Sequence, residues 1–547
     1  MAFLHSDSTA VDVSASAPNA TNYIDMLHKL IQFAVNESVA TSALNAAGTG
    51  YAVGDIFEID GGTHPSTLAN ARATFEVLTL SGSAIATFRI RDAGSYTVAP
   101  GTTGIATTAL SGGGSGATLD LTYASNGWTV DRQTQEAASA VISAGGSGYN
   151  IGDDIETLGG DTRVGFDAPQ TETPGLFNVD AVSSGAITTL SVVSGGTYHR
   201  APANPASTVL STGTGDNLAT LTVTYSAIID TTTDIEVWMT STAGASVGIR
   251  SYTNTTSVFN WEIASAPLYT DANDFEAQVN MTVGRYPDND TGSYCVLRDI
   301  AFNYYMRVTD RGINCVFNVD NGIYSSIHIS LLNPYATGTE YDYPMLVVGS
   351  SSQHDFNILS TNTAWLGMNA AVAENDADNG PAQVFTPGGS WIPFHNGYNS
   401  GGNILGVNAT FHLIPGGNFE TQDSLIEEAD RIASNNTNSE KQDWGSFASI
   451  ATATSAGGED APTERFRPTP QSSGDDQLYL AEVVCMGIEP VNLVAGEMDG
   501  IRRIDRELNV GTLSAEDLID AGGDLYVVFN NCRMTNREHW FALKVSP

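Results

Sequence analysis

The sequence predicts a mainly β protein, made of several β-sandwich or β-roll modules with one amphipathic helix near the N-terminus. Three observations support this class: one stretch of helical periodicity, an internal repeat, and 55 glycines spread among short segments that alternate apolar and polar residues. A chain of 547 residues is also too long for a single core, so we expect three or four compact parts.

The predicted helix lies between Asn22 and Glu37. Its apolar residues recur at three- and four-residue spacing, which places them on one face, and they are Tyr23, Met26, Leu27, Leu30, Ile31 and Ala34. Thr21 or Asn22 can cap its first turn. We expect residues 1–44 to form an N-terminal arm and this helix, which either packs on its own β-domain or docks on a neighbouring subunit.

The internal repeat consists of three blocks in one order. The block Gly48–Asp55 returns as Gly146–Asp153, with the tyrosines offset by 149 − 51 = 98. Two later blocks return at an offset of 102, and these pairs are Gly94–Pro100 with Gly196–Pro202 and Ala117–Tyr123 with Ala219–Tyr225. The order predicts a duplicated module at residues 45–125 and 138–226, in which Tyr51 superposes on Tyr149 and Tyr96 on Tyr198.

Each copy contains the pattern Gly-x-Tyr-x-x-Gly/Ala-Asp/Pro twice, so we expect a module built from two related halves. Glycines permit the positive φ of tight turns, and the alternation in Ile56–Ile59 and in Ala117–Tyr123 is typical of strands. These segments resemble the Gly-x-Tyr-x-x-Gly-Asp segments of phage fibre, tail and capsid-associated proteins. That resemblance implies β-rich spacers or decorations.

The sequence outside the repeats resembles a family of tailed-bacteriophage virion structural proteins associated with the tail or baseplate. The segments that carry the resemblance are Ile235–Met239, Val247–Arg250, Asn303–Asp310, Val316–Gly349, Gly496–Ile501, Asp524–Phe529 and Arg533–Leu543. The family has no catalytic motif, so the resemblance implies a structural role without catalysis. The modules would then be insertions in a body made of a β-rich part at 227–349, a loop-rich part at 350–473 with a short helix at Asp423–Ala433, and a C-terminal β-rich segment at 474–547.

Charge narrows the possible partners. The chain has 22 basic and 61 acidic residues, a net charge of −39, which disfavours binding to nucleic acid or to an anionic membrane surface. Residues Met1–Ala20 lack the pattern of a signal peptide, and no apolar run is long enough for membrane insertion. Together with these observations, the resemblance implies a virion protein made in the host cytoplasm, whose partners are copies of itself and other virion proteins.

No catalytic, cofactor-binding or metal-binding residue is predicted. The glycine-rich segments Ser111–Gly116 and Gly145–Gly148 lack the Lys-Ser/Thr of a phosphate loop and are interpreted as hairpin turns. The acidic turns Asp288–Gly292 and Asp376–Gly380 lack the distal glutamate of a calcium loop, and His354-Asp355 has no recognisable nucleophile motif. The cysteines have no metal-ligand spacing and are interpreted as buried free thiols; they are Cys295, Cys315, Cys485 and Cys532.

Two other functions remain open from the sequence. Aromatic residues in the loop-rich part, Trp391–His395 and Tyr398, could stack on sugars, which would make the protein a receptor-binding fibre or adhesin for host surface glycan. A pair among the many carboxylates could instead cleave a glycosidic bond, as in a tailspike-like polysaccharide depolymerase. A structural subunit of the tail, baseplate or collar is the preferred hypothesis.

Overall fold

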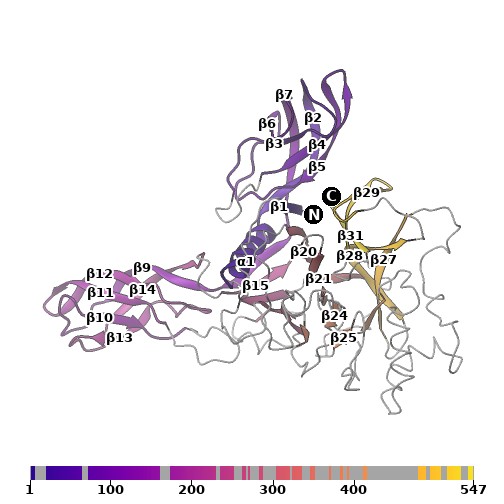
Figure 1. Cartoon of the computed structure of the whole chain (residues 1–547). Coiled ribbons are helices and arrows are strands. Elements are labelled where there is room, and N and C mark those ends of the chain that lie inside the picture. Colours follow the sequence, from indigo (N-terminus) through magenta and orange to yellow (C-terminus); the bar gives the residue numbers. More distant parts are fainter. Residues whose placement is uncertain are drawn as a thin grey trace, which may run out of the picture. The chain divides into compact units, whose positions relative to one another are not determined.

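The computed structural model confirms the mainly β class (Figure 1). It describes residues 2–6, 20–64, 72–160, 173–229, 235–244, 246–251, 261–266, 269–270, 282–286, 304–320, 323–334, 345–350, 369–370, 382–385, 391–393, 411–414, 478–487, 493–506, 514–530 and 540–545. The chain divides into two compact units, the first comprising Met1–Thr129, Thr240–Val247 and Val258–Pro547 and the second comprising Val130–Met239 and Gly248–Ser257.

The helix α1 (Ala20–Val35) is the one helix among the described residues. It begins two residues before Asn22, so Thr21 and Asn22 lie inside it and do not cap it. The predicted apolar stripe is buried at Leu27, Leu30, Ile31 and Ala34. The helix contacts β19 of the same chain, in agreement with packing on its own β-domain. His28, Lys29 and Phe33 are buried as well, so its second half is enclosed more fully than one apolar face predicts.

Module 1 is a six-stranded antiparallel sheet with the spatial order β2-β7-β6-β3-β4-β5. Its strands are β2 (Glu37–Thr49), β3 (Ile56–Ile59), β4 (Thr74–Ser81), β5 (Ala84–Asp92), β6 (Ile105–Ala109) and β7 (Ser115–Ser125). The predicted strand Ile56–Ile59 is therefore β3, and Ala117–Tyr123 lies in β7. The module starts at Glu37, before the predicted boundary at residue 45, because the first half of β2 is mostly Ser, Ala and Thr and shows little apolar alternation.

Module 2 has the same strand order, β9-β14-β13-β10-β11-β12. Its strands are β9 (Gln135–Ala144), β10 (Asp154–Thr157), β11 (Leu176–Ser183), β12 (Ala186–Ser194), β13 (Ala206–Thr212) and β14 (Thr220–Ala227). The register irregularities also recur: β4–β5 and β11–β12 each have three, at positions 102 residues apart, and β2–β7 and β9–β14 each have two. The predicted duplication is confirmed in strand order and in register. Module 2 starts at Gln135, three residues before the predicted boundary at 138.

Each sheet curls until its first strand meets the chain near the end of its fourth strand. In module 1 the Val39 N–H donates to the Ala93 carbonyl at 2.9 Å, and Glu37 forms an antiparallel bridge with Tyr96. In module 2 the Ala137 N–H donates to the Gly195 carbonyl at 2.8 Å, and Gln135 forms the corresponding bridge with Tyr198. Closure of this kind leaves little unpaired strand edge.

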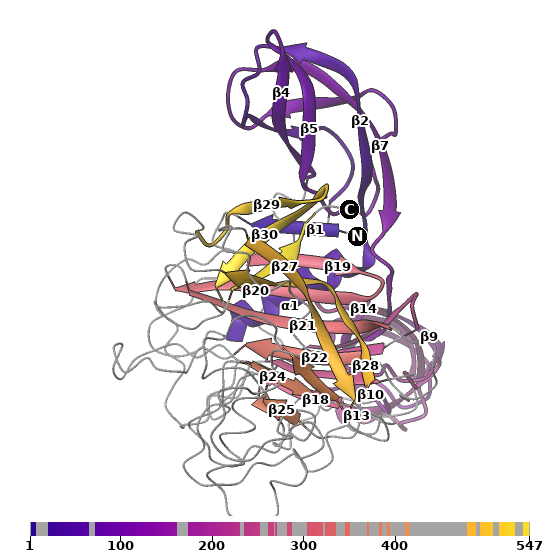
Figure 2. The same cartoon turned by 90° about the vertical axis from the view of Figure 1, so that its right-hand side faces the viewer.

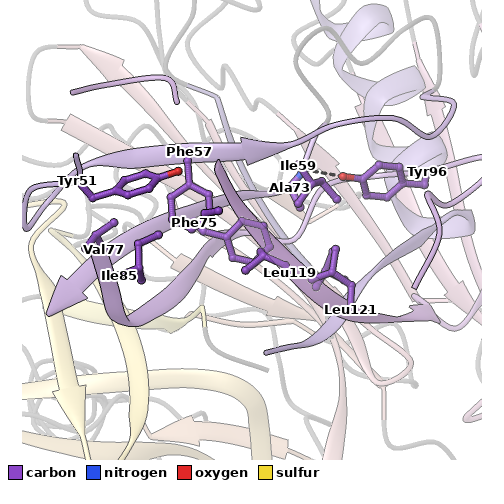
Figure 3. Close-up of a cluster of buried hydrophobic side chains, with 12 residues drawn as sticks. Tyr51, Phe57, Ile59, Ala73, Phe75, Val77, Ile85, Tyr96, Leu119 and Leu121 are labelled. Carbon is purple, nitrogen blue, oxygen red and sulfur yellow. Dashed lines mark hydrogen bonds between the residues drawn. The ribbon is translucent and has the colours of Figure 1, made fainter. Parts of the chain in front are cut away.

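The curled sheet of module 1 encloses an apolar core (Figure 3). Phe57 and Phe75 stack at its centre with ring centroids 5.5 Å apart, and Tyr51 meets Phe57 edge-on at 5.9 Å. Module 2 keeps the same pattern with Ile155 in place of Phe57 and Phe177 in place of Phe75. Complete burial of each such side chain contributes about 1.5–3 kcal/mol, so each module has a core of its own.

The body contains a 13-stranded sheet with the main order β1-β19-β20-β21-β28-β31-β30-β29, whose central strands lie side by side in Figure 2. The main strands are β1 (Ala2–Ser6), β19 (Tyr304–Thr309), β20 (Gly312–Asp320), β21 (Ile323–Pro334), β28 (Leu493–Arg506), β29 (Leu518–Ala521), β30 (Asp524–Asn530) and β31 (Trp540–Lys544). The branching strands are β22 (Met345–Ser350), β24 (Ala382–Phe385), β25 (Trp391–Pro393), β26 (Phe411–Ile414) and β27 (Leu478–Gly487).

The remaining strands flank the modules or complete the body. The strands β16 (Ser246–Ser251), β15 (Glu236–Ser241) and β8 (Trp128–Gln133) are neighbours in that order, and β17 (Trp261–Ala266) and β18 (Thr282–Tyr286) pair next to β23 (Asn369–Ala370). In the predicted loop-rich part, β23, β24, β25 and β26 are strands. The short helix predicted at Asp423–Ala433 lies outside the described residues.

Candidate functional site: the duplicated module and its roots

The segment Gly50-Tyr-Ala-Val-Gly-Asp55 of module 1 folds into one tight turn. The Asp55 N–H donates to the Ala52 carbonyl at 3.2 Å, and the Asp55 carboxylate accepts from the Ala52 N–H at 2.8 Å. Gly54 stands at the third position with φ of +86°, as a type II turn requires. Val53, at the second position, is 65% exposed.

Module 2 repeats this turn closely. The Asp153 N–H donates to the Asn150 carbonyl at 3.2 Å, and its carboxylate accepts from the Asn150 N–H at 2.9 Å. Gly152 has a φ of +89°, and Ile151 is 68% exposed in the place of Val53. The aspartate of the motif thus closes a turn in both copies, which accounts for it without a ligand.

The tyrosine of the motif lies against two glycines. A Cβ on Gly48 would lie 2.8 Å from the Tyr51 ring, and one on Gly114 would lie 2.2 Å from it. In module 2 the Tyr149 ring stands equally close to Gly146, at 2.7 Å, and to Gly215, at 2.2 Å. Any larger residue at these four positions would collide with the ring, so packing requires glycine at each of them.

The second tyrosine of each module has a different role. The Tyr96 hydroxyl accepts from the Ala73 N–H at 2.7 Å, and the Tyr198 hydroxyl binds the Gly175 N–H and the Thr157 side chain. Burial raises the pKa of Tyr96, so it remains a neutral hydrogen-bonding group. The hydroxyls of Tyr51 and Tyr149 have no such partner. The two tyrosines of a copy therefore differ in their hydrogen bonding, and each module is one curled six-stranded sheet.

A third tyrosine packs on the second in both copies. Tyr123 meets the ring of Tyr96 at 5.6 Å, and Tyr225 meets the ring of Tyr198 at 5.5 Å, both edge-on. Burial raises the pKa of Tyr123 to about 12 and also raises the pKa of Tyr225. These rings fill the end of each core near the point where the module begins and ends.

Root 1, formed by Asn36, Ser38 and Asn126, is the place where module 1 joins the body. The first and last strands of the module meet there, since Glu37 pairs with Ser125. The Asn126 amide donates to the Phe33 carbonyl in α1 at 2.7 Å and to the Ser38 hydroxyl at 3.0 Å. One side chain thus links the helix, the first strand and the exit from the module.

Root 2, formed by Arg132, Thr134, His199 and Glu236, holds module 2 to β8 and β15. The Thr134 N–H donates to the Glu236 carbonyl at 2.9 Å, and the Thr134 hydroxyl accepts from the Glu236 N–H at 2.7 Å. Arg132 and Glu236, both nearly buried, form an ion pair at 2.6 Å, and His199 lies 2.9 Å from the Thr134 hydroxyl. Removing one partner of such a buried pair is strongly destabilising, because it leaves an uncompensated buried charge.

A comparable ion pair lies in the 13-stranded sheet of the body. Arg307 forms an ion pair with Asp499 at 2.9 Å, and Thr309 donates to the same carboxylate at 2.8 Å. Burial would raise the pKa of Asp499, but the Arg307 charge and the donated hydrogen bonds together hold it below its usual value. Gly500 has its α-carbon against the guanidinium, where a Cβ would lie 2.1 Å from the Arg307 Cζ atom. The pair joins β19 to β28 across the sheet.

His328 and Cys315 are buried in the same sheet. Burial lowers the pKa of His328 to about 3, and its ring stands 3.0 Å from the Asn314 side-chain oxygen. Burial raises the pKa of the Cys315 thiol to about 12, which keeps it protonated. Cys315 is a free and buried thiol as predicted, whereas Cys485 lies in β27 and Cys295 and Cys532 lie outside the described residues.

The other sequence candidates are placed as follows. Ser111–Gly116 joins the paired strands β6 and β7 and is a hairpin turn, as predicted. Gly145–Gly148 is not, because it joins β9 to β10, which are not neighbours in the sheet. Trp391 lies in β25, and the remaining candidates fall outside the described residues: Asp288–Gly292, Asp376–Gly380, His354, Asp355, His395 and Tyr398.

Sequence reasoning missed the ion pairs of root 2 and the body. Arg132 and Glu236 are separated by 104 residues, and Arg307 and Asp499 by 192. Neither pair has a local motif, and only the topology brings them together. In the part of the chain that the structure describes, no cluster of three or more His, Cys, Asp or Glu side chains could hold a metal ion.

Comparison with known proteins adds no family assignment. No protein-family model matches the chain, and no curated protein matches it significantly. Among the described residues, no helix is long and apolar enough to span a membrane.

Proposed function

We propose that this protein is a structural subunit of a tailed-phage virion, at the tail, baseplate or collar, which acts through contacts with copies of itself and with other virion proteins. Its two modules serve as spacers or decorations on the β-rich body. The proposal rests on the resemblance of the body and of the Gly-x-Tyr-x-x-Gly-Asp segments to phage virion proteins.

The observation that best supports a spacer role is the repetition of a self-contained module whose two ends lie together. Glu37 pairs with Ser125 in module 1, and Gln135 pairs with Ala227 in module 2. An element of this kind can be inserted into a surface connection without disturbing the strands on either side. The polar groups that converge in the roots and in the body sheet are engaged in holding the fold.

Immunogold labelling of purified particles of the encoding phage tests the proposal. Antibodies against this chain should label one fixed station of the particle, in several copies, and the chain should co-purify with intact particles. Its absence from washed particles would contradict a virion role. The rival functions have separate readouts: specific binding on a glycan array would support the adhesin, and release of reducing sugar from host polysaccharide would support the depolymerase.

A further inference from the structure

The two modules share a core but differ on one outer face, the seam face, defined here as the exposed side of β9, β12 and β14 in module 2. These three strands contain one charged residue, Glu136. The corresponding strands of module 1 contain four besides the buried Asp92, and these are Glu37, Arg89, Arg91 and Asp120. Because both copies have one fold, the fold itself does not require this difference.

Two large apolar side chains are exposed on the seam face. Val141 on β9 is 69% exposed and Val193 on β12 is 57% exposed. The residues beside them in sequence, Ile142 and Val192, pack against the core, so both valines point outward. At the same positions module 1 has Ala43, by the offset of 98, and Arg91, by the offset of 102.

The two valines belong to one patch. Two hydrogen bonds join β9 to the chain of β12: the Ala137 N–H donates to the Gly195 carbonyl, and the Ile187 N–H donates to the Gly145 carbonyl. Together they show that the two strands run antiparallel. In this register Val193 of β12 lies opposite Ser139 of β9, and Val141 is two residues further along β9. Side chains at this diagonal spacing lie about 7–8 Å apart on one face of a sheet. Isolated exposed apolar residues are ordinary, but an adjacent pair on a face whose strands carry a single charged residue, Glu136, favours a contact surface.

Charge indicates what covers this face. The chain has a net charge of −39, so two copies repel each other over most of their surface. A face with a single charged residue is the place where two such chains can approach closely, whereas a basic partner would be drawn to acidic surface. An interface between identical copies also places the same patch on both sides, so valine meets valine or serine.

We propose that the seam face of module 2 is a contact between two copies of this chain. This inference deepens the proposed function by naming a partner. It rests on that function only in placing the contact within a virion. Module 1, with Arg91 in place of Val193, does not form the same contact.

The test uses the full-length chain, and the sequence of module 1 guides the choice of substitutions. In the double variant V141A/V193R, module 2 takes the residues that module 1 has at those positions, so the fold is known to accept them. In analytical ultracentrifugation we expect its self-association to be weaker by about tenfold or more, since a few central apolar residues dominate such contacts. The control is L158D, which also gives module 2 the residue that module 1 has at an exposed position. Leu158 follows β10, across the sheet from β9, so the self-association of this variant should be unchanged.

Cross-linking separates this contact from any other between copies. Ser139→Cys places a thiol beside both valines, and Thr41→Cys places one at the same position of module 1. With a short bis-maleimide, we expect Ser139→Cys to give a much higher yield of cross-linked dimer than the unsubstituted chain or Thr41→Cys. Adding V141A/V193R to Ser139→Cys should abolish this dimer. Equal cross-linking of the two variants, or none, would overturn the inference. These results are independent of whether the chain is found in particles, so the proposed function can fail separately.

Discussion

The side-chain amide of Asn126 lies 2.7 Å from the backbone carbonyl of Phe33 and 3.0 Å from the hydroxyl of Ser38. It therefore satisfies a carbonyl in the last turn of α1 and fixes the start of β2 at the same time. Helix C-termini leave carbonyls without intrahelical partners, and a buried one is costly when it is unpaired. This single residue makes the first module continuous with the helix that precedes it.

Replacing Asn126 with alanine should destabilise the protein by about 1–3 kcal/mol, because two buried groups lose their donor. Urea unfolding followed by circular dichroism measures the change. The control is Asn45→Ala, which removes an exposed hydrogen bond to Asp120 and should cost no more than about 0.5 kcal/mol. Equal effects of the two substitutions would contradict the role given to Asn126.

The two tyrosines of module 1 should respond differently to loss of the hydroxyl. Tyr96→Phe leaves the buried Ala73 N–H without an acceptor and should cost about 1–3 kcal/mol. Tyr51→Phe removes a buried hydroxyl that has no partner and should be neutral or slightly stabilising. Thermal unfolding of both variants decides the point, and a large loss for Tyr51→Phe would show that its hydroxyl is hydrogen-bonded.

Two adjacent glycines provide a matched test of the packing around Tyr51. Gly114→Ala places a methyl group 2.2 Å from the tyrosine ring and should destabilise by about 1–3 kcal/mol or more. Gly113→Ala meets nothing within 4 Å and should change stability by less than about 1 kcal/mol, on the stabilising side. Urea midpoints of the two variants measure the difference, and a reversed order would contradict the described contact.

The buried His328 should make the folded protein less stable in acid. The folded protein keeps this histidine neutral down to about pH 3, whereas its usual pKa of 6.5 applies in the unfolded chain. Below pH 6.5 the unfolded state therefore binds the proton first, and stability falls as the pH drops from 6.5 towards 3. The variant H328Q has nothing to titrate, so its unfolding free energy should fall less over this range than that of the unsubstituted protein. Parallel pH profiles would show that His328 does not contribute.

The module was predictable from sequence because its signals are local. Gly48 and Gly146 contact tyrosine rings three residues away, so they recur as a visible pattern, whereas Gly114 and Gly215 reach the same rings from a distant part of the chain. The start of β2 at Glu37 was missed because serine, alanine and threonine give a weak strand signal, and its pairing with β7 is known only from the fold. Sequence patterns could not show the Arg132–Glu236 and Arg307–Asp499 pairs, since each joins residues that only the tertiary structure brings together.

Removal of module 2 tests whether it is an insertion. The Ile228 N–H donates to the Thr134 carbonyl at 3.1 Å, so the residues on either side of 135–227 already lie together. Replacing 135–227 with Gly-Gly should join Thr134 to Ile228 through a short turn, because these two residues are hydrogen-bonded. The shortened chain should keep its β circular dichroism spectrum and lose one unfolding transition. Segment 135–227 alone should fold, since it contains ten buried core residues.

A deletion of similar kind provides the control for this experiment. Removing only 145–219 keeps β9 and β14 but takes away the rest of the module, so Leu221 and Val223 lose the core that buries them. We expect this shorter deletion to aggregate, since exposed apolar strands associate, while the longer one stays soluble. If the longer deletion also aggregates, module 2 is an integral part of the body and the insertion hypothesis is wrong. If it folds, its loss of association between copies, measured by sedimentation, gives the contribution of the whole of module 2, which includes the seam face.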